Sequence, residues 1–222
     1  MVLYDIIKPD PSTLQRALAL DPRVKYVPAV PTSDFPSIGE LEERGISLAN
    51  IVDCAARQYV PMLFDPAIER IQREYPRQGL GIRGTAVYLG EERGMQLDYH
   101  KEIKTLREVL ETGTERKTES GFTRVITSKG MPYGIAMQYA VSGTKSCREA
   151  VAPSQKSFFF PGLFVYDLDL VHFEEPWIIH IPSDAETRKR IILGVYILDF
   201  IDVKHDPVID LFCQTNPIEP LR

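Results

Sequence analysis

The sequence is poor in the residues that most metal and disulfide sites use. Its 222 residues include 3 cysteines and 4 histidines. The cysteines, Cys54, Cys147 and Cys213, are scattered and include no CxxC pair, which indicates ordinary thiols rather than a zinc site or a disulfide framework. No two histidines have helical metal-ligand spacing, and an all-histidine site would need most of the four. We therefore expect no metal site built from cysteine or histidine.

Long apolar runs and an excess of basic residues are also missing. No run approaches the roughly 18 apolar residues of a membrane span, and the first residues show neither a basic start nor a small-residue cleavage site. We therefore expect a soluble, cytoplasmic protein that does not bind a membrane. The net charge of −5 argues against general nucleic-acid binding, although it leaves a local basic groove open.

Apolar β-forming residues are abundant between Ser157 and Val203. They occur in short runs bounded by turn signals, which is typical of strands packed into a core. The runs predict strands over 163–171, 176–181 and 191–201. Ser183 and Glu186 have the spacing of a capping box, which predicts a short helix between the last two strands.

The first half of the chain shows mostly helix signals. Ser12 can cap a helix over 13–20, and Asp65 followed by proline marks the start of another. The longest predicted helix covers 97–112, because its apolar residues recur at helical spacing. Two further helices are predicted after Ser37 and Ser47.

The remaining signals complete the predicted fold. Val24 to Val30 can be an edge strand, Gly79 to Gly90 frames another strand, and further strands are predicted over 122–127 and 133–141. The small, polar residues 142–156 predict a long exposed loop. The order favours one α+β domain over 1–222 with a mainly antiparallel, twisted sheet. It would be helix-rich over 1–113 and strand-rich over 114–203, with an extended tail over 204–222.

Glu174 and Glu175 are candidates for a catalytic carboxylate. They lie between two strongly apolar segments, and adjacent residues of a strand point to opposite faces. One of them would then face a cleft, where desolvation raises the pKa of a carboxyl group. The ordinary alternative is a pair of solvated glutamates at a strand junction.

Several short segments follow a recognisable order: an arginine on an early strand, a strand rich in hydroxyl residues, the segment after it, and a glutamate at the start of a late strand. They are Ile82-Arg83-Gly84, Phe122 to Ser128, Ile135 to Tyr139, and Glu175 to Pro182 followed by Ile192 to Tyr196. Over roughly Gly81 to Phe200, this order resembles that of the ADP-ribosyltransferases.

The resemblance implies an NAD-using transferase or NAD glycohydrolase. Arg83 would bind a phosphate or ribose of NAD, and Tyr88 or Tyr139 would stack on the nicotinamide ring. Ser128 would belong to the serine-containing catalytic strand. Glu175 would stabilise the positive charge that develops on the sugar as nicotinamide leaves.

Two other classes stay open. Asp98, Glu115 and Lys117 resemble the D…ExK pattern of restriction-type nucleases, in which carboxylates hold Mg²⁺ and a lysine assists the attacking water. An acidic chain with many prolines also suits a non-catalytic interaction protein, such as an immunity or antitoxin-like partner or a viral component.

Overall fold

The structure is a computed structural model. It describes residues 4–30, 43, 65–76, 79–92, 95–98, 101–114, 123–126, 134–175 and 178–203. The helices predicted after Ser37 and Ser47 and the predicted tail over 204–222 lie outside these residues, apart from Glu43.

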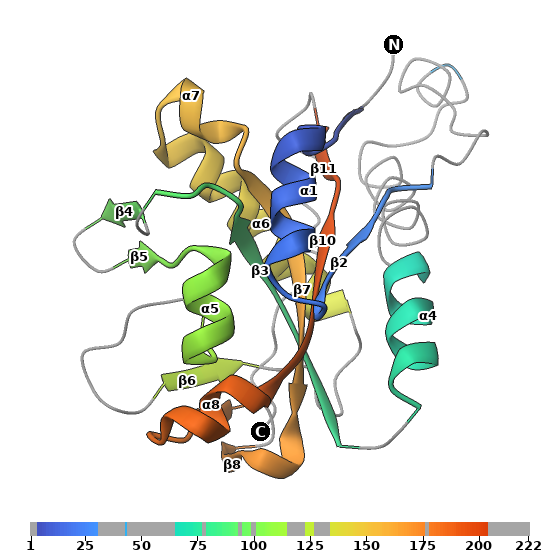
Figure 1. The fold of residues 1–222 in the computed structure, drawn as a ribbon. Helices are drawn as coiled ribbons and strands as arrows, with labels where there is room; N and C mark the ends of the chain where they lie inside the picture. The colour runs from blue at the N-terminus through green and yellow to red at the C-terminus, as the bar shows by residue number, and fades with distance from the viewer. Residues whose placement is uncertain are drawn as a thin grey trace.

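A four-stranded sheet forms the centre of the fold (Figure 1). Its order is β2 (Val24–Val27), β10 (Ile192–Leu198), β7 (Phe159–Asp167) and β3 (Leu80–Tyr88). The pairs β10–β7 and β7–β3 are antiparallel, whereas β2 joins β10 in parallel at the edge. Every residue of β7 is buried, because both faces of the sheet are covered.

One face of this sheet packs against α6 (Gly134–Ala150) and α4 (Asp65–Glu74), which contribute to the same core cluster. Gly84 allows α6 to approach closely, since a Cβ atom there would lie 1.4 Å from the carbonyl oxygen of Ala136. The absence of a side chain at Gly84 therefore determines how closely α6 packs on β3.

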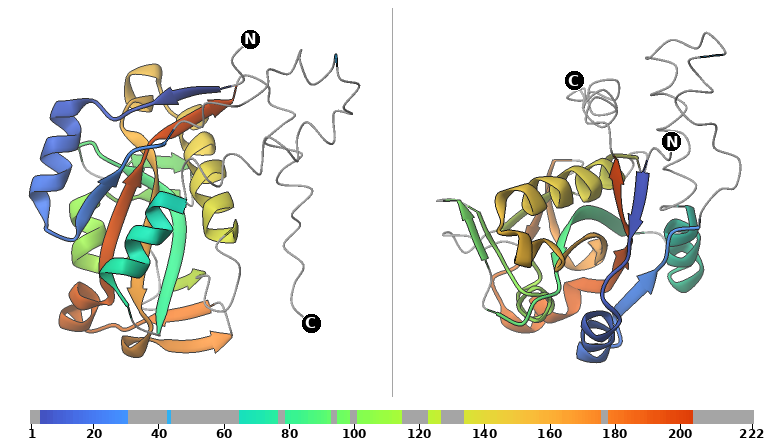
Figure 2. Two further views of the ribbon diagram at one scale, coloured as in Figure 1. Left: turned by 90° about the vertical axis from the view of Figure 1, so that its right-hand side faces the viewer. Right: turned by 90° about the horizontal axis from the view of Figure 1, so that it is seen from above.

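The opposite face packs against α1 (Pro11–Leu20), α5 (Leu106–Thr112) and α8 (Ala185–Ile191), together with a small sheet (Figures 1 and 2). The small sheet has the order β6 (Thr123–Ile126), β9 (Ile178–Ile181) and β8 (His172–Glu175). Ile179 and Ile181 of β9 are fully buried in this second core cluster.

The remaining elements lie around these layers. They are β1 (Tyr4–Ile7) with β11 (Phe200–Val203), the pair β4 (Met95–Asp98) and β5 (Lys101–Ile103), the short helix α7 (Pro153–Lys156), and the 3₁₀ turn η2 (Leu168–Leu170). In the part of the chain described here, no helix has the length and apolar character needed to cross a bilayer.

The predicted α+β fold with a mainly antiparallel sheet is confirmed. The strand predictions near 122–127, 163–171 and 176–181 match β6, β7 and β9, although β7 ends at Asp167 and η2 follows. The strand predicted over 191–201 is β10 and β11, separated at Asp199. Val24–Val27 is an edge strand, as predicted, and α4 begins at the Asp65-Pro66 signal.

The single helix predicted over 97–112 is wrong. Residues 95–98 form strand β4, residues 101–103 form strand β5, and a shorter helix begins at Leu106. Thr105 starts this helix through a capping box: its hydroxyl accepts from the Glu108 backbone, and Glu108 accepts from the Thr105 backbone at 2.7 Å. Ile103 and Leu106 are still buried, but they belong to different elements.

The strand predicted over 133–141 and the loop predicted over 142–156 are also wrong. Residues 134–150 form α6, the longest helix among the described residues, which lies in the C-terminal half of the chain. Small buried residues recur along α6 at helical spacing: Ala136, Ala140, Thr144 and Cys147. Ala136 and Ala140 fall in the segment predicted as a strand, and Thr144 and Cys147 in the segment predicted as a loop. The small size of these residues instead serves the close contact with β3.

Two predicted caps are displaced by a neighbouring aspartate. The helix between the last strands exists, but Asp184 caps it by accepting from the Thr187 backbone at 2.8 Å, in place of Ser183. Asp10 likewise caps α1 in place of Ser12 and accepts from the Thr13 backbone at 3.0 Å. A carboxylate at these positions also suits the positive end of the helix.

Candidate functional site

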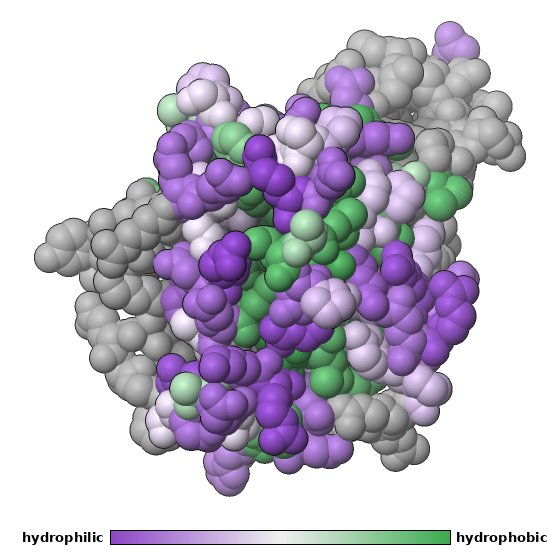
Figure 3. Space-filling view, viewed as in Figure 1, coloured by the Kyte–Doolittle hydropathy of each residue, from purple (hydrophilic) through white to green (hydrophobic). Residues whose placement is uncertain are grey.

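A groove lies between α1, the end of β3 and the start of α5. Its volume is about 280 Å³, and its apolar lining consists of Ala17, Leu20, Leu89 and Leu106. Figure 3 shows hydrophobic surface between hydrophilic flanks on the face of the molecule that carries α1 and α5. The groove is the hollow that we consider as a functional site.

Three local structures position this lining. Arg16 and Leu20 are four residues apart on α1, so both side chains reach the same side of the helix. The backbone of Leu89 donates to Phe158 at 2.9 Å, which fixes the chain where β3 ends. The Thr105 capping box places Leu106 inward and leaves Arg107 exposed at the rim.

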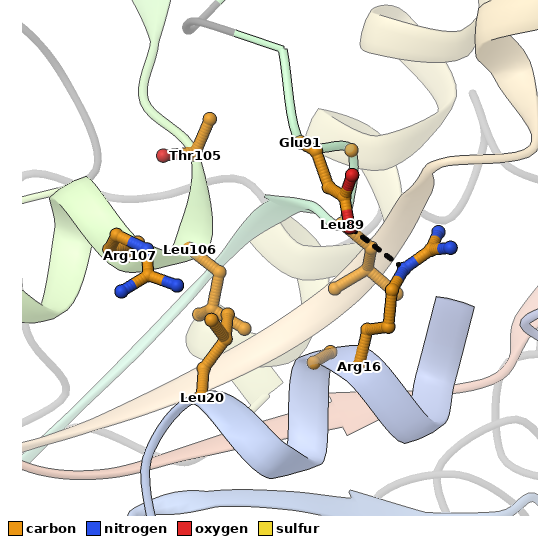
Figure 4. Close-up of a pocket in the computed structure, with 9 residues that line it drawn as sticks. Arg16, Leu20, Leu89, Glu91, Thr105, Leu106 and Arg107 are labelled. Atoms are coloured by element: carbon orange, nitrogen blue, oxygen red, sulfur yellow. Dashed lines mark ion pairs between the residues drawn. The ribbon is translucent and has the colours of Figure 1, made fainter. Parts of the chain in front are cut away.

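The charged residues stand on two walls of the groove. Arg16 Nε lies 3.1 Å from Glu91 Oε1, so this pair links α1 to the segment after β3. In Figure 4, Arg16 and Arg107 lie on opposite sides of Leu20 and Leu106. Within the described residues, the Arg107 side chain makes no ion pair or hydrogen bond.

The polar side chains of the described lining are one hydroxyl and three charged groups. The Thr105 hydroxyl lies 2.9 Å from a Glu108 carboxylate oxygen and also accepts from the Glu108 backbone, so the cap occupies it. Among the described lining residues there is no cysteine, histidine or serine to act as a nucleophile or base. The groove offers apolar contact and charge.

The structure separates the residues predicted to bind NAD. Strand β3 pairs with β7 without a register shift. Arg83 and Tyr88 are an odd number of residues apart on β3, so they belong to opposite faces of the sheet. Tyr88 is 1% exposed, contacts Phe158 and Phe159, and donates to Gln155 at 3.3 Å. Burial, with a smaller contribution from Glu92, raises the pKa of Tyr88. Tyr88 is thus a core residue.

The other members of the predicted set lie elsewhere. Tyr139 is exposed on α6, and Ser128 lies outside the described residues. Arg83 is opposite Phe164 and shares its face of the sheet, the face on which β9 packs. Glu175 ends β8, the neighbour of β9, so Arg83 and the strand of Glu175 lie on the same side.

Glu174 and Glu175 would point to opposite faces only if their strand were regular. Their strand instead has a register shift between Phe173 and Glu175, which places Glu174 at a bulge. A bulge interrupts the alternation of side chains. The predicted opposite orientation of the two glutamates therefore loses its geometric basis, and the catalytic role of Glu175 stays a prediction.

The nuclease residues are only partly described. Asp98 ends β4 rather than lying on a helix, while Glu115 and Lys117 fall outside the described residues. Among the residues with described positions, no three His, Cys, Asp or Glu side chains gather closely enough to hold a metal ion. The Mg²⁺ nuclease likewise stays a prediction.

The sequence did not indicate the groove. Of its lining, only Leu106 belonged to a predicted apolar stripe. The other residues come from segments 16–20, 89–91 and 105–107, which meet only in the folded chain.

No protein-family model, curated protein or solved structure matches the chain. The geometry of the groove is accordingly the main basis for a functional assignment.

Proposed function

We propose that this chain is a binding protein that holds a small apolar molecule in the groove between α1 and α5. The observation that carries the proposal is the hollow itself, with Ala17, Leu20, Leu89 and Leu106 around it. Small-molecule sites are concave, mainly apolar, and supplied with a few polar groups that orient the ligand. Arg16, Glu91 and Arg107 are such groups here.

The size of the groove limits the ligand. Its volume of about 280 Å³ is slightly below the roughly 300–1,000 Å³ that ligand sites span. A compact ligand such as a short-chain or aromatic molecule fits this range better than a large cofactor. Leu20 is 37% exposed and can lose further apolar surface to water when a ligand covers it.

The test is a titration with N-phenyl-1-naphthylamine, a neutral fluorescent probe for apolar sites. We expect saturable binding that Leu20→Ser weakens about fivefold, because part of the apolar contact is lost. Leu18→Ser is the matched control: Leu18 is 38% exposed on the same helix but does not line the groove. Equal effects of the two substitutions, or no saturable binding, would contradict the proposal.

The ADP-ribosyltransferase interpretation is kept as a second proposal. The observation that favours it is that Arg83 and the strand of Glu175 lie on one side of the main sheet, with a bulge beside the glutamate. Bulges are frequent next to active sites. Release of nicotinamide from NAD that Glu175→Gln abolishes would support it, and absence of release by the unaltered chain would dismiss it.

A further inference from the structure

We infer that the groove selects a ligand with one negative charge, and that Glu91 lowers the affinity for that ligand by neutralising one of two arginines. The inference rests on the proposed binding function. It adds a charge class to the ligand, and it gives Glu91 and Arg107 opposite roles in selectivity.

The first observation is the charge of the lining. The whole chain has a net charge of −5, yet the described lining of the groove contains Arg16 and Arg107 and, among its carboxylates, Glu91 alone. The local charge is therefore opposite in sign to that of the chain. A site with one excess cation beside apolar surface suits a molecule with an apolar body and one anionic group.

The second observation is how the charges pair. Glu91 contacts Arg16 at 3.1 Å, and the Arg16 guanidinium also donates to the Thr13 hydroxyl at 3.2 Å. Arg107, on the other wall, has no such partner within the described residues. A ligand anion therefore meets a neutralised arginine on α1 and an available arginine on α5.

The third observation is that the Arg16–Glu91 pair is exposed. The two side chains are 52% and 75% exposed, respectively. Such surface pairs contribute little to stability, so the fold does not depend on this one. A ligand carboxylate or sulfonate can form a bidentate contact with a guanidinium beside apolar surface, where water screens the charges less.

These observations assign Arg107 as the primary contact of the ligand anion. Glu91 opposes that anion by repulsion and by occupying Arg16. Glu91→Gln should therefore increase the affinity for an anionic ligand, and Arg107→Gln should decrease it. Both substitutions should affect the affinity for a neutral ligand of the same shape much less than that for the anion, because the apolar lining is kept.

The experiment compares two probes with one aromatic framework. 8-Anilino-1-naphthalenesulfonate carries a sulfonate, whereas N-phenyl-1-naphthylamine is its neutral counterpart. At low salt we expect Glu91→Gln to tighten binding of the sulfonate about threefold and Arg107→Gln to weaken it about threefold. Binding of the neutral probe should change less than twofold in both variants.

Two matched controls come from α8, which contributes no residue to the groove. Glu186 pairs with Lys189 at 3.2 Å and is exposed, so Glu186→Gln also frees a surface cation. Arg190→Gln removes an exposed arginine from the same helix. We expect both controls to leave the affinity ratio of the two probes unchanged, which excludes an effect of net charge alone.

The outcomes separate the inference from the proposed function. Suppose that the neutral probe binds and that Leu20→Ser weakens its binding. If the affinity ratio of the two probes in Glu91→Gln or in Arg107→Gln then stays within twofold of that of the unaltered chain, the charge inference is overturned while the binding proposal stands. An equal shift in the α8 controls also overturns the inference. If the neutral probe shows no saturable binding to the unaltered chain, the binding proposal fails and the inference fails with it.

Discussion

The carboxylate of Glu74 accepts a hydrogen bond from the Tyr196 hydroxyl at 2.7 Å, which joins α4 to strand β10 in the centre of the main sheet. Lys25 and Arg70 also contact this carboxylate, at 2.8 and 2.7 Å. Burial favours the neutral acid, but hydrogen bonds from Lys25, Arg70 and Tyr196 outweigh it and lower the pKa of Glu74 to about 2.

The first prediction concerns acid stability. The pKa of Glu74 falls from 4.5 to about 2 on folding, so its contribution is complete above about pH 4.5 and is lost as the pH falls toward 2. Because the side chain is 25% exposed, we expect this contribution to be about 1–3 kcal/mol. Urea unfolding of Glu74→Gln should show a smaller pH dependence between pH 5 and 2 than that of the unaltered chain. Identical slopes would contradict the role of Glu74.

The second prediction concerns Asp199, a fully buried residue between β10 and β11. Its carboxylate accepts from the Tyr26 hydroxyl at 2.5 Å and from the Ala29 backbone at 2.9 Å. Asp199→Ala leaves both donors without this partner, so we expect a loss of about 2–4 kcal/mol in the free energy of unfolding.

Tyr26→Phe provides the matching half of a double-mutant cycle. It removes one donor and should cost about 1–2 kcal/mol. Since the two residues share a hydrogen bond, the double variant should lose less than the sum of the single effects. Additive losses in urea unfolding would show that the contact contributes little.

The third prediction concerns Gly84. A Cβ atom at this position would lie 1.4 Å from the Ala136 carbonyl oxygen and 2.9 Å from the Ala140 backbone nitrogen. Gly84→Ala must therefore displace α6, and we expect a loss of at least about 3 kcal/mol or failure to fold. The measurement is the midpoint of thermal or urea unfolding.

Gly143 in α6 is the control for this substitution. A Cβ atom there would lie 3.6 Å from its nearest neighbour, which is an ordinary contact. Gly143→Ala should stabilise the chain by about 0.5–1 kcal/mol, because alanine favours a helix more than glycine does. A similar loss at both positions would argue against the close approach at Gly84.

The fourth prediction connects a helix cap to the groove. Thr105→Ala removes the side chain that accepts from the Glu108 backbone, and we expect a loss of about 1 kcal/mol. The cap also positions Leu106 in the lining, so binding of N-phenyl-1-naphthylamine should weaken. Thr105→Ser keeps the cap and should preserve both properties. Equal binding by the alanine and serine variants would show that the cap does not shape the groove.

Much of the fold could be predicted where one local signal dominated. The apolar runs between Phe159 and Leu198 are strands because burial on both faces of a sheet selects such runs. The prediction of a helix over 97–112 is wrong because it follows the apolar spacing and ignores a local signal for the start of a helix. Thr105 and Glu108 have the same spacing as the motif read at Ser183, and it marks where the helix begins.

The wrong predictions over 133–156 and the missed groove have the same cause: both features depend on contacts between elements that are distant in the sequence. Ala136 and Ala140 were predicted to lie in a strand, and the close contact of α6 with Gly84 that their small size permits exists only in the folded chain. The groove depends on Leu20, Leu89 and Leu106, which belong to segments that no local pattern brings together. Such a site requires the packing of three elements to be known.

The ladder between β1 and β11 determines how the chain responds to mechanical force. Tyr4 is opposite Val203 and Ile7 is opposite Phe200, so the strands run antiparallel with residues 4 and 203 at the same end. Tension applied through these two residues pulls the strands apart from one end, so the force acts on one residue pair of the ladder at a time. The ladder should therefore open pair by pair at low force, before tension reaches the four-stranded sheet through Asp199 and β10.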